Sequence, residues 1–452
     1  MNLPNFFFAD LPPEAVLPPA MIEAACDTLK RNREKYLGPR STDEIVKILC
    51  EVATDWRQPE NIFRKHALEL GPAETGYSQA VLATGLDGFF RQFTPDNFQA
   101  LLEQELGHAQ RLDRFVGADE EKSSRTAMAH GPEFLVHIAA GNIPNPTLMS
   151  ITLGLLTRSA QFVKCASGAS LLPRLFAHSI YQADPKLGAC LEIAEWRGGN
   201  RELETVLFDR ADCLTATGAD ETLAAIRAQL PAKVRFLGYG QRVSLGFVTR
   251  EVLREETVAE VVSRAADDLV AWDQNGCLSP HVIYVEERGA VESDKFAARL
   301  AVELAKREAS APRGKIAVEA AAAIASQRTI YETIAAHRAD ARIWSSQNST
   351  AWTVVFEHEV RFRFSPLNRF IYVKPVPDVA AVMPGVDEIH GKVSTVGVAA
   401  LPEKTKELAL RFARWGATRI CPLGQMQNPP LTWRHDGRPA LGDLVTWTDW
   451  EP

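Results

Sequence analysis

The sequence contains no Cys-x-x-Cys pair and no His-Glu-x-x-His segment, and its ten histidines lack the spacing of metal ligands. We therefore expect no structural metal site. The cysteines are odd in number, which does not suit a disulfide framework and fits a reducing cytoplasm. The seven are Cys26, Cys50, Cys165, Cys190, Cys213, Cys277 and Cys421.

A strong charge bias and a long apolar run are also missing. Lys and Arg number 50 against 57 Asp and Glu, a formal net charge of -7, so nothing indicates a positive surface for nucleic acid or anionic lipid. No apolar run reaches the length of a membrane span. Residues 1–20 have no basic n-region, and their prolines interrupt any apolar core, which is not the pattern of a signal peptide. We expect a cytoplasmic protein with no integral membrane association, acting on small molecules and not on nucleic acid.

The first part of the chain, residues 1–125, has a helical pattern. Segments 42–56 and 95–109 carry apolar residues at three- and four-residue spacing, near a Thr or Asp suited to cap a helix. We expect this region to be a helical cap or an oligomerisation layer. The polar segment 117–133 is interpreted as a connector.

Residues 126–245 alternate short apolar runs with helix-length segments. Such strand–helix–strand units imply a parallel sheet, and their repetition predicts a Rossmann-type, dinucleotide-binding domain. The first unit comprises 133–141, 146–159 and 160–166, and the second comprises 201–217, 218–230 and 232–240.

The rest of the chain is interpreted as a second α/β domain, residues 246–430, followed by a C-terminal arm, residues 431–452. The run 244–252 introduces this lobe, and the alanine-rich segment 317–327 is expected to be helical. Helices are expected at 255–273 and 291–309, and strands at 281–287, 350–357 and 369–376. The fold class is therefore α/β.

One thiol lies in polar surroundings. AWDQNGCLSPH (271–281) places Cys277 after a glycine and behind Asp273, Gln274 and Asn275. A structural cysteine prefers apolar neighbours, whereas a nucleophilic one needs access to its substrate and a setting that favours the thiolate. Cys277 is the candidate nucleophile.

Three other segments place polar residues where predicted strands end, which is where open α/β sheets bind ligands. Asn142 in AAGNIPNP is a turn residue or a neutral donor to an oxyanion. Lys164 in VKCAS is a surface lysine or a cation for a ribose or its 2′-phosphate. Thr217 and Gly218 stand at a strand–helix junction, where backbone amides attract a pyrophosphate, although the segment is not GxGxxG.

The order and approximate spacing of AGNIP, VKCAS, TGADETLAAIR and DQNGCLSP resemble those of the aldehyde dehydrogenase superfamily. DQNGCLSPH and the tail RICPLGQMQNPPLTWRHDGRPALGDLVTWTDWE (419–451) are similar, more narrowly, to the long-chain acyl-coenzyme A reductases of the LuxC type, the reductase component of a fatty-acid reductase. This resemblance runs from roughly residue 40 to the C-terminus.

The resemblance implies an aldehyde-dehydrogenase-like fold and a role for each matching residue. It assigns Cys277 as the nucleophile, Asn142 as the oxyanion donor, Lys164 as the lysine on the ribose and Gly218 as the glycine under the cofactor. It implies that an acyl thioester, carried by coenzyme A or by a partner protein, is reduced to an aldehyde through an acyl-Cys277 intermediate. The superfamily likeness and the tryptophan-rich tail suggest a homo-oligomer.

Two departures from the family pattern sharpen this expectation. Phe236 stands where hydrolytic aldehyde dehydrogenases carry a water-activating glutamate, which favours reduction over hydrolysis. Ser167 stands where members that prefer NAD carry a glutamate for the ribose hydroxyls. Without that carboxylate, and with Lys164 nearby, we expect NADPH as the cofactor.

A second cofactor glutamate of the family, ahead of a Phe-Gly-Pro segment, is replaced by Phe362, although Glu357 or Glu359 could contribute instead. His281, four residues after Cys277, is interpreted as structural or as an aid to proton transfer.

Three alternatives stay open at this point. The protein could be an NAD(P)-dependent aldehyde dehydrogenase that works oxidatively, against which Phe236 speaks. It could be a cofactor-free thiol acyltransferase, or a non-catalytic partner subunit in which Cys277 is dispensable.

Overall fold

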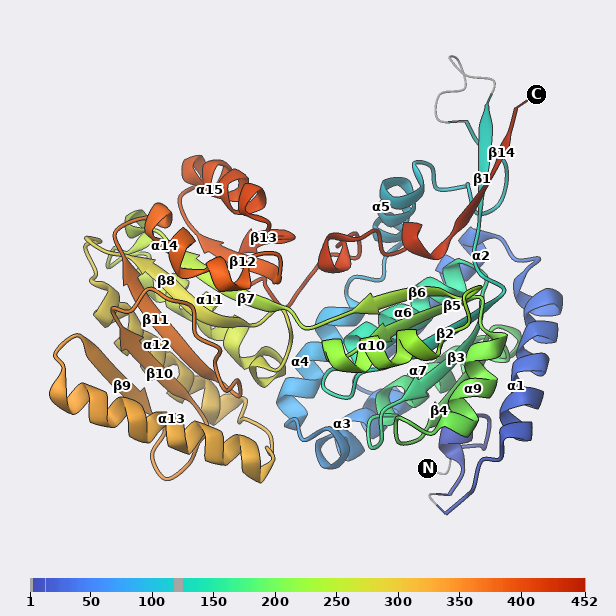
Figure 1. Cartoon of the computed structure of the whole chain (residues 1–452), viewed down its shortest axis with the longest axis horizontal. Helices are drawn as coiled ribbons and strands as arrows, with labels where there is room; N and C mark the ends of the chain where they lie inside the picture. The colour runs from blue at the N-terminus through green and yellow to red at the C-terminus, as the bar shows by residue number, and fades with distance from the viewer. Residues whose placement is uncertain (1–2, 13, 118–124, 452) are drawn as a thin grey trace. The chain divides into compact units, whose positions relative to one another are not determined.

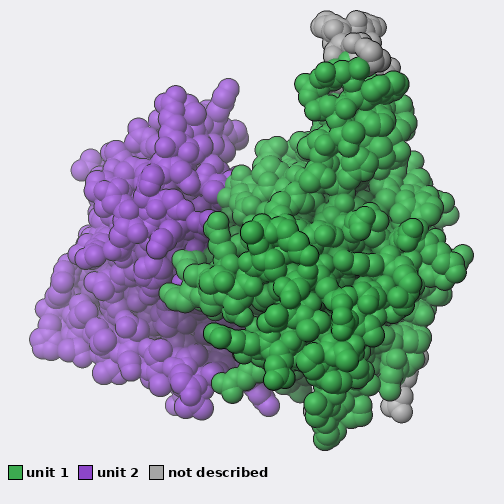
Figure 2. Space-filling model, turned by 45° about the vertical axis from the view of Figure 1, so that its right-hand side comes forward, with its two compact units in different colours: residues 1–75, 86–240, 430–452 green, residues 76–85, 241–429 purple. Residues whose placement is uncertain are grey.

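The computed structural model describes residues 3–12, 14–117 and 125–451. The chain forms two compact units, shown in green and purple in Figure 2. Unit 1 contains residues 1–75, 86–240 and 430–452, and unit 2 contains residues 76–85 and 241–429. The first part of helix α4 (Gln79–Phe90) therefore belongs to unit 2, although its sequence lies within the helical N-terminal region.

Unit 1 is built on a parallel sheet of five strands in the order β4-β3-β2-β5-β6. The strand order reverses between β2 and β5. The carboxyl ends of these two strands therefore form the topological switch point, where open α/β sheets bind ligands. The parallel sheet predicted for this region is confirmed. The strands are β2 (Phe134–Ile138), β3 (Ala160–Cys165), β4 (Leu191–Glu195), β5 (Cys213–Thr217) and β6 (Arg235–Tyr239).

Helices cover both faces of this sheet. Figure 1 shows α1 (Pro19–Asn32) and α9 (Arg201–Arg210) beside each other against it. Their apolar side chains and those of α10 (Asp220–Gln229) pack on alternate strand residues such as Phe134 and Val136. The opposite face meets α6 (Asn145–Leu156) and α7 (Leu171–Ala183). The remaining helices of unit 1 are α2 (Thr42–Trp56), α3 (Ile62–Thr75), α5 (Pro95–Leu106) and α8 (Pro185–Gly188).

Helix α2 shows why the N-terminal region folds as its pattern predicts. The side chain of Ser41 accepts a hydrogen bond from the backbone N–H of Glu44, and the Glu44 carboxylate accepts one from the backbone N–H of Ser41. This capping box fixes the first turn, and the buried face then carries Ile45, Leu49 and Val52 at helical spacing. The predicted bounds 42–56 are confirmed.

Three expectations about unit 1 need correction. The segment 201–217 does not start as a strand, because its first ten residues form α9 and only β5 is extended. Helix α7 and strand β4 lie between the two predicted units and were missing from the prediction. The connector predicted at 117–133 contains strand β1 (Thr126–His130), which pairs antiparallel with β14 (Thr446–Trp450) of the C-terminal arm. Residues 118–124 of that connector lie outside the described residues.

Unit 2 contains a sheet of seven strands in the order β13-β12-β7-β8-β11-β10-β9. Six strands run parallel, and β9 pairs antiparallel with β10 at the edge. The strands are β7 (Val243–Val248), β8 (Pro280–Glu286), β9 (Ala341–Ser345), β10 (Thr353–Glu357), β11 (Phe370–Val376), β12 (Val393–Ala399) and β13 (Arg419–Pro422).

Two apolar cores lie on the two faces of this sheet. Helices α11 (Val258–Val270) and α12 (Ser293–Ser310) cover one face. The other face meets α13 (Val318–His337), α14 (Val379–Gly385) and α15 (Pro402–Trp415). Because both faces are covered, the central strands β8 and β11 are buried along their whole length, which explains their continuous apolar runs.

No helix in the described ranges combines the length and the apolar character needed to cross a membrane.

Candidate active site

The residues expected to bind a cofactor lie at the carboxyl ends of the strands of unit 1. Asn142 is exposed in the loop after β2, Lys164 is the last residue but one of β3, and Thr217 ends β5. The loops after β2 and β3 touch, because a Cβ on Gly141 would lie 3.4 Å from the Cβ of Ala166. Asn142 and Gly168 line one small pocket. The structure thus brings the Asn142 and Lys164 loops together.

Lys164 is a buried cation, since the residue is only 5% exposed. Burial lowers the pKa of its ammonium, while the carboxylates of Glu204 and Glu195 act in the opposite direction. Its Nζ lies 5.9 Å from the centre of the Trp196 ring. The charge is therefore held at the strand end and is not spread over a flexible surface side chain.

Glu195 is a residue at this edge that sequence reasoning missed. It ends β4 opposite Cys165, and its Oε1 accepts a hydrogen bond of 2.7 Å from the backbone N–H of Gly168. The carboxylate consequently lies beside Ser167, the exposed position at which a carboxylate was expected to be absent. The sequence signal was an acidic residue at a strand end, but β4 itself had not been predicted.

Thr217 and Gly218 join β5 to helix α10, as the sequence indicates. The backbone N–H of Gly218 donates to the carbonyl of Tyr239 at 3.1 Å, which ties this junction to the end of β6. The first turn of α10 also carries Asp220 and Glu221. Their negative charges interact with the positive end of the helix dipole and so reduce its attraction for a phosphate.

Phe236 lies in β6, paired with Leu214 of β5, and packs against the apolar core of unit 1. Its ring edge would lie 2.9 Å from a Cβ on Gly238. A side chain placed in this way contributes packing and offers no group that could activate water.

Cys277 lies in unit 2, three residues before the amino end of β8, and is partly exposed. Its backbone carbonyl accepts a hydrogen bond of 2.7 Å from the hydroxyl of Ser244 at the start of β7. Two residues later, the hydroxyl of Ser279 accepts a hydrogen bond from the side-chain amide of Gln427. The cysteine segment is therefore tied to the amino ends of the central strands.

The other six thiols differ from a nucleophile in one shared respect, which is that burial raises their pKa. The pKa rises to about 12 for Cys26, Cys165, Cys190 and Cys421 and to about 11 for Cys50, and it is also raised for Cys213. Thiols with raised pKa values form little thiolate near neutral pH.

The backbone just before Cys277 is unusual. Trp272, Asp273 and Gln274 have φ angles of 52°, 48° and 64°, so three consecutive non-glycine residues adopt the left-handed conformation. At about 1–2 kcal/mol for each residue, this turn costs roughly 3–6 kcal/mol. Such strain persists only where contacts with the surrounding structure hold the backbone in this conformation.

Each of the three side chains is anchored. The Trp272 ring packs where a Cβ on Gly85 would lie only 2.1 Å from its Cζ2, so the glycine makes room for the ring. The Nε2 of Gln274 donates to the carbonyls of Pro280 and Phe370, both at 2.8 Å. Asp273 is 2% exposed and forms an ion pair with Arg369.

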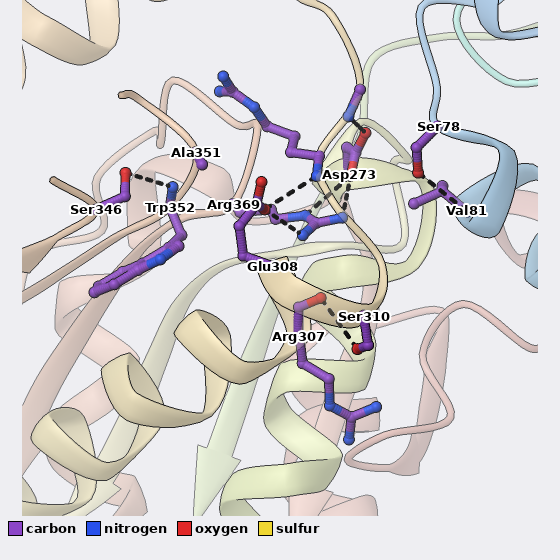
Figure 3. Close-up of polar contacts among 12 residues, drawn as sticks. Ser78, Val81, Asp273, Arg307, Glu308, Ser310, Ser346, Ala351, Trp352 and Arg369 are labelled. Atoms are coloured by element: carbon purple, nitrogen blue, oxygen red, sulfur yellow. Dashed lines mark hydrogen bonds and ion pairs between the residues drawn. The ribbon is translucent and has the colours of Figure 1, made fainter. Parts of the chain in front are cut away.

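A second left-handed turn faces the first. Leu367, Asn368 and Arg369 have φ angles of 62°, 58° and 65° and directly precede β11. Figure 3 shows the Arg369 guanidinium between Asp273 and Glu308. The side chain of Arg369 is fully buried. No sequence signal marked this arginine, because its partners lie 96 and 61 residues away.

His281 is buried at the start of β8, and its Nδ1 accepts a hydrogen bond of 3.0 Å from the backbone N–H of Ser365. The rings of Phe362 and Phe364 each lie 5.9 Å from it. Burial lowers the pKa of His281 to about 4. These contacts favour the structural interpretation of this histidine.

Glu357, considered above as a cofactor residue, is engaged in a buried cluster of unit 2. Its carboxylate accepts hydrogen bonds from the Lys374 ammonium at 2.6 Å and from the Tyr331 hydroxyl at 3.0 Å. Phe362 is 2% exposed and packs in the core on the same face. In the described part of the chain, no group of three or more His, Cys, Asp or Glu side chains is arranged to hold a metal ion.

Comparison with known proteins gives three kinds of match. A family model described as acyl-CoA reductase (LuxC) matches residues 37–447. A long-chain acyl-protein thioester reductase of Photorhabdus laumondii is 23% identical, over 90% of this chain and 82% of that protein. A long-chain acyl-protein thioester reductase of Vibrio harveyi is 22% identical, over 92% of this chain and 84% of that protein.

Solved structures share the fold. A putative aldehyde dehydrogenase from Anabaena variabilis matches 96% of this chain and 93% of its own, with a TM-score of 0.69 and 16% identity. An NADP-dependent glyceraldehyde-3-phosphate dehydrogenase from Bacillus halodurans, complexed with NADP, matches 96% and 91% with a TM-score of 0.70 and 14% identity. At these identities the similarity shows the fold, which is the aldehyde-dehydrogenase-like α/β fold expected from the sequence.

Proposed function

Because the chain belongs to the acyl-CoA reductase (LuxC) family, we propose that it reduces a long-chain acyl thioester to the aldehyde, with Cys277 carrying the acyl group. The family match over residues 37–447 is the observation that supports this most strongly. Cys277 is partly exposed, and Ser244 holds its backbone carbonyl, which supports its role as the nucleophile.

The reaction starts when the Cys277 thiolate attacks the thioester carbonyl. The bond from the carbonyl carbon to the departing sulfur breaks, and the proton that left Cys277 ends on the departing thiol. The acyl group is then a thioester of Cys277. A nicotinamide cofactor, which the Lys164 edge of unit 1 would hold, would supply the hydride that reduces its carbonyl carbon. The resulting thiohemiacetal alkoxide collapses, which breaks the carbon–sulfur bond and releases the aldehyde and the Cys277 thiolate.

Both additions place negative charge on the carbonyl oxygen. We assign the Asn142 side-chain amide and the Cys277 backbone N–H as donors to this oxyanion, a type of contact worth about 3–4 kcal/mol for one donor. Asn142 is exposed in the loop that follows β2.

Loss of the acyl group to water would waste the intermediate. Phe236, which the family resemblance places at the position of the water-activating glutamate, packs against the core of unit 1. The acyl-Cys277 thioester therefore has no neighbouring base at this position and persists until hydride arrives.

The proposed cofactor is NADPH. The carboxyl edge of a parallel sheet fits a dinucleotide, and Lys164 offers a cation there beside the exposed Ser167–Gly168 turn. Glu195 opposes this preference, because its carboxylate lies at the same turn and repels a 2′-phosphate while accepting a hydrogen bond from a free 2′-hydroxyl. We therefore propose a preference for NADPH that Glu195 limits, so that NADH is also used.

The substrate class follows from the family, and either coenzyme A or a carrier protein is the proposed acyl donor. The relatives described above are named for acyl-protein thioesters, which favours a donor protein as partner. We also propose a homo-oligomer, because all five residues of β14 are exposed and Trp447 and Trp450 are 43% and 55% exposed.

Intact-protein mass spectrometry with a long-chain acyl-coenzyme A, before and after NADPH, tests the proposal. Wild type should gain one acyl group that NADPH discharges as aldehyde, and Cys277→Ala should gain none. An adduct that NADPH and NADH both leave in place would identify a thiol acyltransferase. No adduct with any thioester, together with oxidation of an aldehyde by NAD(P), would identify the oxidative enzyme.

A further inference from the structure

The two left-handed turns of unit 2 are joined by side chains, although they are far apart in sequence. The amide of Asn275 donates to the side-chain oxygen of Asn368 at 3.4 Å, and Gln274 donates to the carbonyl of Phe370. Arg369 donates to Asp273 Oδ1 from Nε at 2.9 Å and from Nη2 at 2.6 Å. The turn before Cys277 is thus fastened to the turn before β11.

Arg369 is the centre of this arrangement. Its Nη1 donates to Glu308 Oε2 at 3.0 Å, so one guanidinium links the turn to helix α12 as well. Asp273 Oδ2 accepts from the backbone N–H of Gly314 at 3.0 Å, which uses the second carboxylate oxygen. The carboxylate is therefore fixed in one orientation, and Figure 3 shows it facing the guanidinium.

The orientation of this turn continues to Cys277 through a short, bonded segment. The backbone N–H of Asn275 donates to the carbonyl of Trp272 at 2.8 Å, and that of Ser279 donates to the carbonyl of Gly276 at 2.9 Å. Ser244 holds the Cys277 carbonyl. With few free torsions between Asp273 and Cys277, a change of the turn moves the thiol.

We propose that Arg369 is a positioning residue for the nucleophile. It does not touch the substrate, and it holds Asp273 in the left-handed conformation that presents Cys277 at the amino edge of the sheet. The expected effect on acylation rests on the proposed function. The expected effect on the position of the turn rests on the contacts of Arg369 alone.

Arg369→Lys tests the role with the charge retained. A lysine ammonium is a point charge without the planar fork, so it cannot keep both Asp273 and Glu308 in their present geometry. The rate constant of Cys277 acylation should fall about tenfold or more with little change in KM, since a misplacement of about 1 Å costs up to about a hundredfold in rate. Amide exchange over peptide 271–279 should become faster.

The matched control is Arg64→Lys in unit 1. Arg64 is a buried arginine that binds both oxygens of Asp87, at 2.5 and 3.1 Å, and it belongs to unit 1, whereas the Cys277 segment belongs to unit 2. Arg64→Lys should lower the melting temperature and leave acylation within about twofold of wild type. Asp273→Asn, which keeps the shape of the side chain, serves as a second variant if Arg369→Lys fails to fold.

Iodoacetamide labelling separates this inference from the proposed function. Followed by peptide mass spectrometry, the labelling rate of Cys277 should change at least about fivefold in Arg369→Lys, while that of Cys421, in the same unit, stays within about twofold. A wild type that no thioester acylates would refute the proposed function but leave this readout intact. If Arg369→Lys labels Cys277 at the wild-type rate, the role of Arg369 is overturned. The same follows if Arg369→Lys is acylated at the wild-type rate although peptide 271–279 exchanges faster.

Discussion

The candidate residues of unit 1 lie at or just beyond the carboxyl ends of their strands, whereas Cys277 and Arg369 of unit 2 precede the amino ends of theirs. At the first edge the backbone is ordinary apart from a glycine turn, and the charges of Lys164 and Glu195 stand near an exposed loop. At the second edge the backbone is left-handed and the charges are buried in ion pairs. The first edge thus places its charges beside an exposed loop where a ligand can approach, and the second uses buried charges to hold a strained turn in place.

Cys277→Ala should have the largest effect and should separate the proposed functions of the two edges, which are acylation in unit 2 and cofactor binding in unit 1. Acyl-enzyme formation should be lost completely, because no other thiol occupies this position, whereas the dissociation constant for NADPH should stay within about twofold. Intact mass and fluorescence titration measure the two effects. Cys421→Ala is the control and should keep acylation. Parallel loss of cofactor binding in Cys277→Ala would contradict the separation.

Gly85→Ala should disrupt the left-handed turn before Cys277, because the added methyl group overpacks the space that the Trp272 ring fills. A helical glycine-to-alanine change is normally stabilising, but here the new Cβ would meet the Trp272 ring at 2.1 Å. We expect a loss of about 1–3 kcal/mol in the free energy of unfolding, with slower acylation. Gly218→Ala at the carboxyl edge is the comparison, because its Cβ would have no atom closer than 3.9 Å. Denaturant unfolding should show wild-type stability for that variant.

Asp268 makes unit 2 sensitive to pH. It accepts hydrogen bonds from the backbone N–H groups of Gly424 and Met426, and burial raises its pKa to about 7. The folded state therefore holds a proton that the unfolded state has already lost above about pH 4, so stability falls as pH rises from about 4 to 7, by at most about 1.4 kcal/mol per pH unit.

Asp268→Asn should flatten that slope, as measured by urea unfolding at a series of pH values. The variant is expected to be less stable than wild type at pH 5, because an amide cannot accept both N–H bonds. An unchanged slope would show that another group carries the dependence.

The smallest effects are expected at the carboxyl edge. Ser167→Glu adds a carboxylate at the exposed turn and should shift the ratio of kcat/KM toward NADH by about fivefold, or roughly 1 kcal/mol. Glu195→Gln removes the neighbouring carboxylate and should shift it toward NADPH by a similar factor. Steady-state kinetics with both cofactors gives the ratio, and movement in the same direction by both variants would refute the placement of this loop beside the ribose.

The contrast between the edges also explains what the sequence could predict. The capping box of α2 and the apolar runs of β2, β8 and β11 are local signals, and they located α2, β8 and β11 to within one residue, whereas the run predicted for β2 extended three residues beyond its end. Lys164 and Thr217 were found because ligands of parallel sheets bind beyond strand ends, a rule that needs only the strand prediction. The roles of Cys277, Asn142, Lys164, Ser167, Thr217 and Gly218 stay predictions.

What escaped prediction depends on contacts distant in sequence. Arg369 carries no local mark, and its meaning depends on Asp273, 96 residues earlier. The left-handed φ of Trp272 is imposed by packing at Gly85 and runs against the preference of a bulky residue. Strand β1 was taken as part of a connector because the segment 117–133 is polar as a whole, and β1 forms only by pairing with β14.

The pairing of β1 with β14 also sets an order of events during synthesis. Thr126 pairs with Trp450, and the intervening chain includes all of residues 241–429 of unit 2. At about 5–20 residues per second, a ribosome needs roughly 15–65 seconds between the two strands. The nascent protein therefore holds β1 without its partner while residues 241–429 emerge, and this strand pair of unit 1 forms only after unit 2 has been synthesised.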